Sequence, residues 1–508
     1  MQKRRMAKAG EVYAYYIKRL KKYCAYQIIR ANKEDICYLA LDYLASEPPD
    51  ADSLASLQPY HLESFRHHHS IEKSLIANTP VPRDYIYIGE CDLKSNDKCS
   101  FYSADWSKGN SYIREERWKG FGKKYTDAYK KYINSGDFVN LHGQLIKKNL
   151  GGLEDSLYAI LTEKDTLDLF LCITYASITG YSDKLKHWLH KTPLLTRLYL
   201  KDAGVEILDL SRTHLDHLEL NLTGVTTLKL PSSVEWLEIY GDINENLQID
   251  DSCCKENIVD FVIVLNNTPI KRYGLKNVKI DSLLLGNCNV LDMALIAKYF
   301  PEIEELIMYG NPGNIINFQA IENLHNLVCI HCSNLFGYTA SDMESLQALP
   351  NLCEIDFDSI PKEAGTYLKK FWKNKLDKVS VTRLRNDGWL HENLHNPLRH
   401  WDGSEFVPKA AYKSALKCYK ETKKKLLLAT TKTESEQLVI KYTQHFNILN
   451  EKYNEFIETD EREDIFMAME QLYDECILHS TGEAIEEKNA FISLEEIWDI
   501  MDNERDDW

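Results

Sequence analysis

The fold of this chain is clearest in one stretch of its sequence, Phe300-Pro301-Glu302-Ile303-Glu304-Glu305-Leu306-Ile307-Met308-Tyr309-Gly310-Asn311. Apolar residues stand at positions 303, 306 and 308, which is the spacing LxxLxL, and an Asn follows three positions after the last of them. In an extended segment, alternate side chains point to opposite faces. The stretch therefore predicts a short strand whose apolar side chains share one face.

The same spacing recurs in one register from residue 195 to residue 381. The steps between successive starts are 20, 19, 24, 22, 23, 24, 25 and 24 residues. A near-constant step indicates stacked copies of one structural unit, because a single unit cannot bury its apolar face alone. The nine matches are Leu195-Leu198-Leu200, Leu215-Leu218-Leu220, Val234-Leu237-Ile239, Ile258-Phe261-Ile263, Ile280-Leu283-Leu285, Ile303-Leu306-Met308, Leu327-Ile330-Cys332, Leu352-Ile355-Phe357 and Leu376-Val379-Val381.

This pattern resembles the leucine-rich repeat superfamily, over about 195–385. The Asn or Cys of the superfamily consensus is present at Asn266, Cys288 and Asn311, where it is expected to close the turn by bonding backbone groups. The resemblance implies a solenoid with a curved parallel sheet and a concave binding surface. In the longer units, 291–300 and 341–349 suit helices. The shorter first units are similar to a bacterial subtype of roughly 20 residues, which suggests a bacterial protein.

The segment before the repeats carries a different pattern. Residues 1–190 are predicted to form a mainly helical domain with a small strand region. Apolar residues recur at helical spacing in 11–30, and alternation in 84–102 indicates strand. Further helices are expected at 33–46, 51–77, 121–150 and 153–190.

The segment after the repeats is predicted to be helical. Residues 386–404, rich in Trp, His and turn residues, are expected to cap or connect the repeats. Residues 405–508 are expected to form an acidic helical bundle, with three helical patterns over 406–478 and a capping box at Ser493 and Glu496. The expected fold class is α+β: a leucine-rich repeat solenoid at 191–385 between these two flanking domains.

The net charge of −16 is unevenly placed along the chain. Residues 1–30 carry nine Lys or Arg against one Glu, and residues 451–508 carry twenty Asp or Glu against four Lys or Arg. An acidic body argues against general nucleic-acid binding, because phosphate affinity needs a cationic surface. The basic N-terminal segment is expected to be a solvated surface. Contact with an acidic partner or with the acidic C-terminal segment is the alternative.

The cysteines indicate a reducing compartment. The chain has thirteen, without the spacing of a zinc ribbon or a thioredoxin site, and most lie in apolar runs, as Cys37, Cys172 and Cys476 do. This pattern favours reduced core thiols and a cytoplasmic protein. The sequence contains no run of eighteen apolar residues, so a membrane span is not expected. The first basic residues are not followed by the apolar core of an export signal, so such a signal is not expected either.

The positions between the template residues are the candidate binding residues, because they face outward on the concave sheet. Aromatic and charged side chains there offer a partner protein a large contact area at little cost in rotamer freedom. Coverage of the aromatics by a flanking domain is the alternative. The candidates are Arg197, Tyr199, His217, Glu219, Trp236, Glu238, Tyr240, Glu305, Tyr309, His331, Asp356 and Asp358.

One motif points to an enzyme instead. The sequence His391-Glu392-Asn393-Leu394-His395 is a literal HExxH, which on a helix places two zinc ligands on one face with a Glu as general base. At those five residues only, it resembles the zincin metallopeptidases. Pro397 disfavours continuation of the helix there, so a structural cap is the preferred interpretation and a zinc-dependent hydrolase the alternative.

Two other clusters contain the residue types that bind metals. In Cys329-Ile330-His331-Cys332 the strand register turns Cys332 inward and the other two outward, so the three are not expected to converge on one ion. The run His67-His68-His69 is more typical of a solvated segment. Neither a metal nor a cofactor is expected.

The predicted function is therefore a non-catalytic scaffold or sensor that binds a partner protein through the concave surface. A role as a bacterial effector, immunity or defence component is a further alternative suggested by the short bacterial-type units.

Overall fold

A computed structural model describes residues 5–63, 71–77, 79–95, 98–99, 101–103, 106–162, 170–255, 257–265, 268–393, 395–480, 492–506 and 508. The chain divides into two compact units, residues 1–384 and 385–508, which are described in turn.

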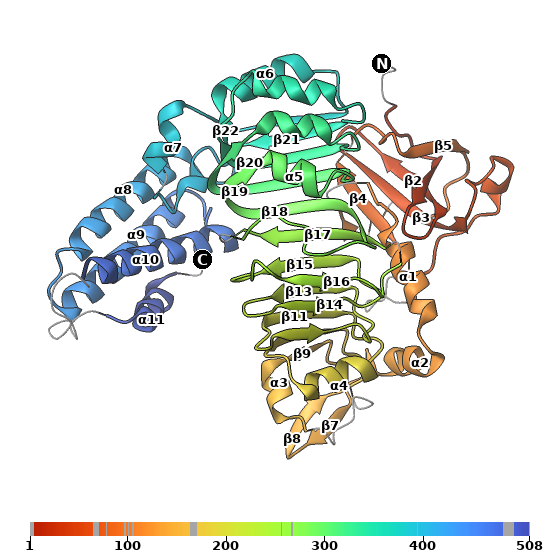
Figure 1. The fold of residues 1–508 in the computed structure, drawn as a ribbon, viewed down its shortest axis with the longest axis horizontal. Coiled ribbons are helices and arrows are strands. Elements are labelled where there is room, and N and C mark those ends of the chain that lie inside the picture. The colour runs from red at the N-terminus through yellow and green to blue at the C-terminus, as the bar shows by residue number, and fades with distance from the viewer. Residues whose placement is uncertain are drawn as a thin grey trace. The chain divides into compact units, whose positions relative to one another are not determined.

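The first unit is built on one parallel sheet of eleven strands (Figure 1). Nine of the strands coincide with the nine predicted matches, and each pairs with the next match along the chain, so the predicted parallel ladder is confirmed. The strands, from one edge to the other, are β9 (Gly152–Glu154), β10 (Tyr175–Thr179), β11 (Arg197–Asp202), β13 (His217–Asn221), β15 (Trp236–Tyr240), β17 (Ile258–Val264), β18 (Lys279–Asp292), β19 (Glu305–Ile316), β20 (Cys329–Phe336), β21 (Glu354–Asp358) and β23 (Lys378–Val381).

The template residues form the core of this unit. The central residue of each match from Leu198 to Ile355 is fully buried and lies beside its equivalent on the next strand. Burial of each such side chain stabilises the fold by about 1.5–3 kcal/mol. Val379 in the ninth match is only half-buried, because it lies on the last strand of the sheet.

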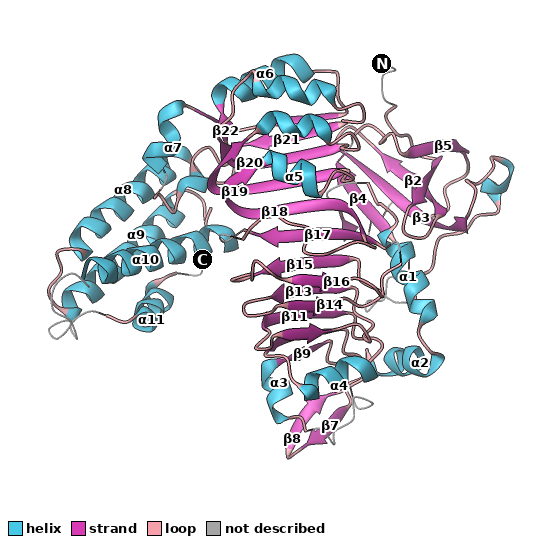
Figure 2. Cartoon of the chain, in the orientation of Figure 1, coloured by secondary structure: helices cyan, strands magenta, loops and turns pink. Residues whose placement is uncertain are grey.

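The length of each unit decides what returns the chain to the sheet. In the short early units the return is a strand, and β12 (Ile207–Asp209), β14 (Thr227–Lys229) and β16 (Gln248–Asp250) form a second parallel sheet. In the longer units it is helical, as Figure 2 shows: α5 (Met293–Tyr299), the 3-10 helices η3 (Phe318–Asn323) and η4 (Asp342–Ala348), and α6 (Lys362–Trp372). The helices expected at 291–300 and 341–349 are thus confirmed.

The turns after the strands have a further feature that was not predicted. Cys288 is buried and its thiol donates to the Leu285 carbonyl at 3.4 Å, as predicted. Asn311 is exposed, and Asn266 lies outside the described residues. The residue two positions after the last template residue adopts a left-handed conformation in four units, with φ of 54°, 54°, 51° and 40° at Asn287, Asn334, Ser359 and Arg383. Asn tolerates this conformation better than most residues do.

The N-terminal segment is not mainly helical, and that prediction is wrong. Residues 11–45 form three antiparallel strands, and the helices expected at 11–30, 33–46 and 51–77 are absent from the described part of the chain. A six-stranded sheet of order β5-β1-β2-β3-β4-β6 takes their place. Its strands are β1 (Glu11–Ile17), β2 (Lys22–Ala31), β3 (Asp35–Ala45), β4 (Lys73–Ala77), β5 (Tyr85–Glu90) and β6 (Phe101–Tyr102), with a 3-10 turn, η1 (Asp52–Ala55), between β3 and β4. The strand expected within 84–102 is confirmed.

The helical prediction failed because the central strands of this sheet are buried on both faces. Along β2 and β3, neighbouring residues belong alternately to two separate apolar clusters, one containing Tyr26 and Tyr38 and the other Ala25 and Leu39. A strand covered on both sides has no polar face, so its sequence lacks the period of two by which strands are recognised.

Residues 106–191 mix helices with strands. The helices are α1 (Asn110–Gly120), α2 (Lys123–Tyr132), α3 (Asp155–Ile160) and α4 (Asp183–Lys191), and a hairpin of β7 (Phe138–Leu141) and β8 (Gln144–Lys147) replaces the second half of the helix expected at 121–150. Because β9 and β10 join the large sheet, the ladder begins near residue 152 and not at the predicted boundary of 190/191.

The cysteines are not all reduced. Cys37 in β3 is joined to Cys99 by a disulfide that spans 62 residues of sequence. The expectation of a reduced core thiol is therefore wrong for Cys37, whereas Cys172 and Cys476 are buried thiols that form no disulfide, as expected.

The second unit, residues 385–508, is helical as predicted. Its helices are α7 (Asp387–Asn393), the 3-10 turn η5 (Arg399–Trp401), α8 (Lys409–Leu426), α9 (Lys432–Lys452), α10 (Thr459–Ser480) and α11 (Leu494–Glu504). The expected capping box at Ser493 and Glu496 is present, and both of its hydrogen bonds form. The predicted connector 386–404 belongs to this unit, since Leu398 and Trp401 lie in the core of the bundle.

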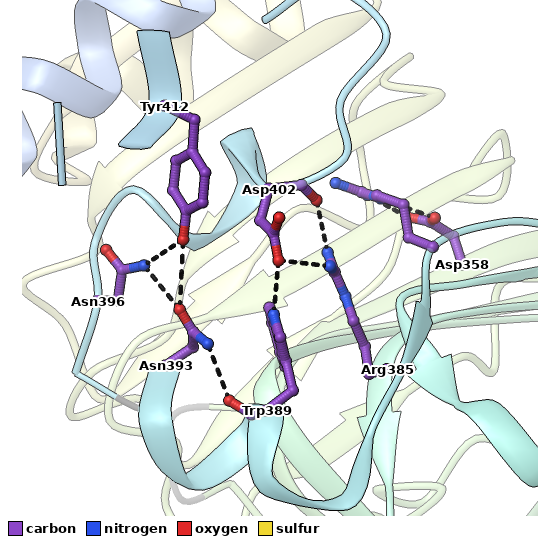
Figure 3. Close-up of polar contacts among 8 residues, drawn as sticks. Asp358, Arg385, Trp389, Asn393, Asn396, Asp402 and Tyr412 are labelled. Carbon is purple, nitrogen blue, oxygen red and sulfur yellow. Dashed lines mark hydrogen bonds and ion pairs between the residues drawn. The ribbon is translucent and has the colours of Figure 1, made fainter. Parts of the chain in front are cut away.

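A hydrogen-bonded network holds the connector together (Figure 3). Asp402 accepts from the Arg385 guanidinium at 2.9 Å and from the Trp389 indole at 2.8 Å. The amide of Asn396 donates to Asn393 at 2.8 Å and to the Tyr412 hydroxyl at 3.1 Å. Buried polar groups are costly unless they are hydrogen-bonded, so these contacts account for the polar composition of the connector.

Substitution of an inward template residue should destabilise the first unit much more than substitution of its outward neighbour. Leu283→Ala removes a fully buried side chain and should lower the unfolding free energy by about 2–5 kcal/mol. Ser282→Ala, on the opposite face of the same strand, should change it by no more than about 0.5 kcal/mol. Urea denaturation followed by circular dichroism measures both, and equal midpoints for the two variants would contradict the inward assignment of Leu283.

Candidate functional site

The candidate site is one face of the eleven-stranded sheet. We call it the ladder face, and it consists of the side chains that alternate with the core residues along the strands. All twelve candidate binding residues project from strands of the large sheet, and all twelve are exposed or half-buried. They form two groups, on β11, β13 and β15 and on β19, β20 and β21, separated by β17 and β18.

Three residues of the first group and Tyr175 on β10 form a row of aromatic rings that crosses four adjacent strands. The rings of Tyr175 and Tyr199 lie 6.1 Å apart edge to face, Tyr199 and His217 lie 5.8 Å apart, and His217 stacks on Trp236 at 5.3 Å with an interplanar angle of 7°. Residues that face each other on adjacent strands lie within reach of such ring contacts. The row is therefore a preformed, partly buried aromatic surface. Arg197 is exposed at its margin.

Carboxylates lie beside this row. The Glu219 carboxylate contacts Nε2 of His217 at 2.8 Å. Burial and the charge of Glu219 raise the pKa of Glu238 on the next strand. The hydroxyl of Tyr240 donates to the Leu200 carbonyl at 3.4 Å, which holds its ring across two strands.

The second group contains a thiol, an imidazole and carboxylates. Cys329 Sγ lies 3.1 Å from Nε2 of His331, and Nδ1 of His331 lies 3.5 Å from Asp356 on β21. Glu305 on β19 is directly opposite Cys329. As predicted, Cys332 points inward and is 1% exposed. Tyr309, on the same face, is 47% exposed and is the most open of the candidate aromatics.

The arrangement of Cys329, His331 and Asp356 resembles the nucleophile, base and orienting acid of a cysteine hydrolase. The charges around Cys329, however, disfavour the thiolate that such an enzyme needs. Burial raises the pKa of the Cys329 thiol, and the carboxylates of Glu305 and Glu354 raise it further. A catalytic cysteine needs a lowered pKa, since the thiolate is the nucleophile. The cluster therefore lacks the activated thiol of a cysteine hydrolase.

Asp358 is the candidate that the structure assigns to an internal contact. Its carboxylate accepts from Arg383 Nε at 2.8 Å and from the Thr382 hydroxyl at 2.5 Å, both on the loop after β23. This pairing fixes the turn at the end of the sheet, so Asp358 is not counted among the residues available to a partner.

One edge of the ladder face is contacted by the N-terminal module, which is the described part of residues 5–120. An acidic rim receives its cations, and each of its residues stands one or two positions before the central template residue of a match. Arg19 pairs with Glu235 at 3.0 Å and with Asp260 at 2.8 Å. Lys18 pairs with Glu304, Arg117 with Asp216 and Glu235, and Arg83 with Asp377. The rim consists of Asp216, Glu235, Asp260, Asp281, Glu304 and Asp377.

These contacts correct the expectation for the basic N-terminal segment. Lys18 and Arg19 are not merely solvated, because they meet an acidic surface within their own chain. The alternative that a flanking domain covers the aromatic residues is supported in part. Trp236 is half-buried, whereas Tyr309 remains exposed.

The HExxH motif does not have the geometry of a zincin. Helix α7 ends at Asn393, so His395 lies beyond it and the two histidines do not share a helical face. Both side chains are exposed, and Asn393 between them belongs to the buried network of the connector. The prediction of a structural role is favoured over the zinc-hydrolase alternative. The run His67-His68-His69 lies outside the described residues.

Comparisons with known proteins add no family assignment, since no protein-family model and no curated protein matches the chain. Within the described ranges, no helix has the length and apolarity needed to cross a bilayer.

Sequence reasoning missed three features of the site. Tyr175 lies on β10, and the buried residues Ile173, Ala176 and Ile178, in and just before this strand, repeat the template pattern 22 residues before Leu195. The small Ala176 concealed this match. The acidic rim could have been read from the recurrence of Asp or Glu just before the central template residue. The proximity of Glu305 to Cys329 required the pairing register, which no single repeat reveals.

The burial of Asp216 beneath Arg117 predicts a pH effect on stability. Burial raises the pKa of Asp216 to about 6, Arg117 opposing and Glu235 reinforcing the shift. Since the folded pKa lies above the unfolded value, ionisation disfavours the folded state, and this contribution to stability is lost as the pH rises from about 4 to 6. The loss is on the order of 2 kcal/mol.

Asp216→Asn should remove this loss. The difference in unfolding free energy between wild type and variant, measured by denaturation from pH 4 to pH 7, should shift against the wild type as the pH rises. A difference that stays constant over this range would show that Asp216 titrates normally.

Proposed function

We propose that this chain is a leucine-rich repeat protein whose ladder face binds a partner protein and carries out no catalysis there. The observation that carries the proposal is the aromatic row from Tyr175 to Trp236, which spans four neighbouring strands. Aromatic side chains dominate the energetics of protein interfaces because they bury large areas with few rotatable bonds. A rigid sheet adds preorganisation, which lowers the ordering cost of binding.

The charges suggest the chemistry of the partner. Half-buried carboxylates line the ladder face on both sides of its centre, among them Glu219, Glu238, Glu354 and Asp356. The neighbouring acidic rim already accepts Arg and Lys side chains from the N-terminal module. A partner that presents Arg or Lys beside aromatic or apolar residues is complementary to this surface. A bacterial effector, immunity or defence role is compatible with such binding, but no residue selects among these.

The proposal is tested with the full-length chain as bait in the cells that produce it. The captured protein is purified and titrated by calorimetry against the double variant Tyr199→Ala, Tyr309→Ala. Loss of two aromatic anchors should weaken binding roughly thirtyfold, about 2 kcal/mol. The matched control is Ile207→Ala, whose side chain is 56% exposed on the three-stranded sheet away from the ladder face.

The melting temperatures of both variants should remain near that of the wild type, because none of the three side chains lies in the core. Equal affinity of wild type and double variant would refute binding through the ladder face, as would an equal loss in the Ile207 control.

A further inference from the structure

We propose that Glu305, Cys329 and His331 bind a divalent transition-metal ion, zinc first, on the ladder face. The three residues come from two neighbouring strands, and one ligand atom from each lies within 4.8 Å of the other two. No sequence motif joins them, because Glu305 is brought to Cys329 only by the pairing of β19 with β20.

The spacing of the ligand atoms is close to that required by a tetrahedral ion. Typical zinc bonds to sulfur, nitrogen and oxygen place the ligand atoms roughly 3.4 to 3.6 Å apart. In the protein, Cys329 Sγ and His331 Nε2 are 3.1 Å apart, and the widest separation in the group is within 4.8 Å. Binding would therefore require the side chains to shift by about 1 Å, which is within the range of side-chain rotation. The site would be formed by positions i and i+2 of one strand and one residue of the next.

The surroundings of His331 are those of a metal ligand. Its Nε2 atom faces the thiol, and its Nδ1 atom faces the Asp356 carboxylate at 3.5 Å. A carboxylate behind the imidazole fixes the ring and its tautomer, which is the usual support for a zinc-bound histidine. Asp356 would thus act as a positioning residue and not as a ligand.

The ligand set indicates the kind of metal. A thiolate with an imidazole and one carboxylate suits zinc, whereas magnesium and calcium prefer oxygen ligands throughout. Glu354 lies opposite Cys329 on the other side, so the ligands sit among further negative charge. The ammonium of Lys108, from the N-terminal module, lies in the field of the same groups and would be displaced or repelled by the ion. Three protein ligands leave a fourth tetrahedral position for solvent or a partner's side chain.

The inference is independent of the proposed function, because the ion can bind whether or not the face also binds a protein. The test uses the full-length chain, stripped with chelator under reducing conditions and titrated with zinc chloride against a chromophoric competitor. The wild type should bind one equivalent. Cys329→Ser and His331→Asn should each weaken binding at least a hundredfold, and Asp356→Asn should weaken it roughly ten- to a hundredfold.

Three control variants separate this site from other ligands. His217→Ala removes a histidine of the same face that also contacts a Glu, Cys253→Ser removes an exposed thiol, and His391→Ala removes the first histidine of the HExxH motif. All three should bind zinc like the wild type. Cobalt titration gives a second readout: a thiolate-to-cobalt charge-transfer band should form in the wild type and be absent from Cys329→Ser.

The outcomes distinguish the possibilities. Absence of a zinc equivalent in the wild type, or unchanged affinity in Cys329→Ser and His331→Asn, would overturn the inference, as would loss of zinc in His391→Ala alone. Because the ligands project from the face and not into the core, circular-dichroism spectra of the variants should match the wild type. If one variant fails to fold, the other and the wild-type cobalt spectrum decide.

Discussion

The first unit of this chain depends on the burial of one kind of residue: the inward aliphatic and aromatic side chains that stack from strand to strand. Each strand is too short to be stable alone, and each gains its buried area only from the strands beside it. The core is therefore continuous from Leu153 on β9 to Val381 on β23. Every other feature of the unit follows from keeping these side chains in line.

That alignment also produces the ladder face. When the inward residues are in register, the outward ones are in register too, so side chains eighteen or more residues apart in sequence become direct neighbours. The aromatic row of Tyr175, Tyr199, His217 and Trp236 and the cluster of Glu305, Cys329 and His331 both arise in this way. The acidic rim arises in the same way along one edge of the ladder face, where it pairs with the cations of the N-terminal module. The clustering of these outward side chains is thus a consequence of core packing.

The sequence was informative where burial is one-sided and misleading where it is not. In the repeats and in the C-terminal helices, polar and apolar residues separate cleanly, and the pattern predicted the elements. In 11–45 the strands β2 and β3 are covered on both faces, so apolar residues stand at consecutive positions and the period of two disappears. Val12, Tyr15, Tyr16 and Leu20 then matched helical spacing by coincidence. Ala176 hid a repeat for the related reason that a small side chain can fill an inward position where its neighbours are large.

By itself, the sequence determined the parallel ladder, the helical returns of its longer units, the C-terminal helices and the outward placement of the candidate residues, because each of these follows from local periodicity. Only the tertiary structure decided the N-terminal sheet, the Cys37–Cys99 disulfide, the ion pairs between the N-terminal module and the acidic rim, and the meeting of Glu305 with Cys329. These depend on which distant segments pair and in what register. Long-range pairing is fixed by the summed burial of the whole unit, and no short stretch of sequence contains that sum.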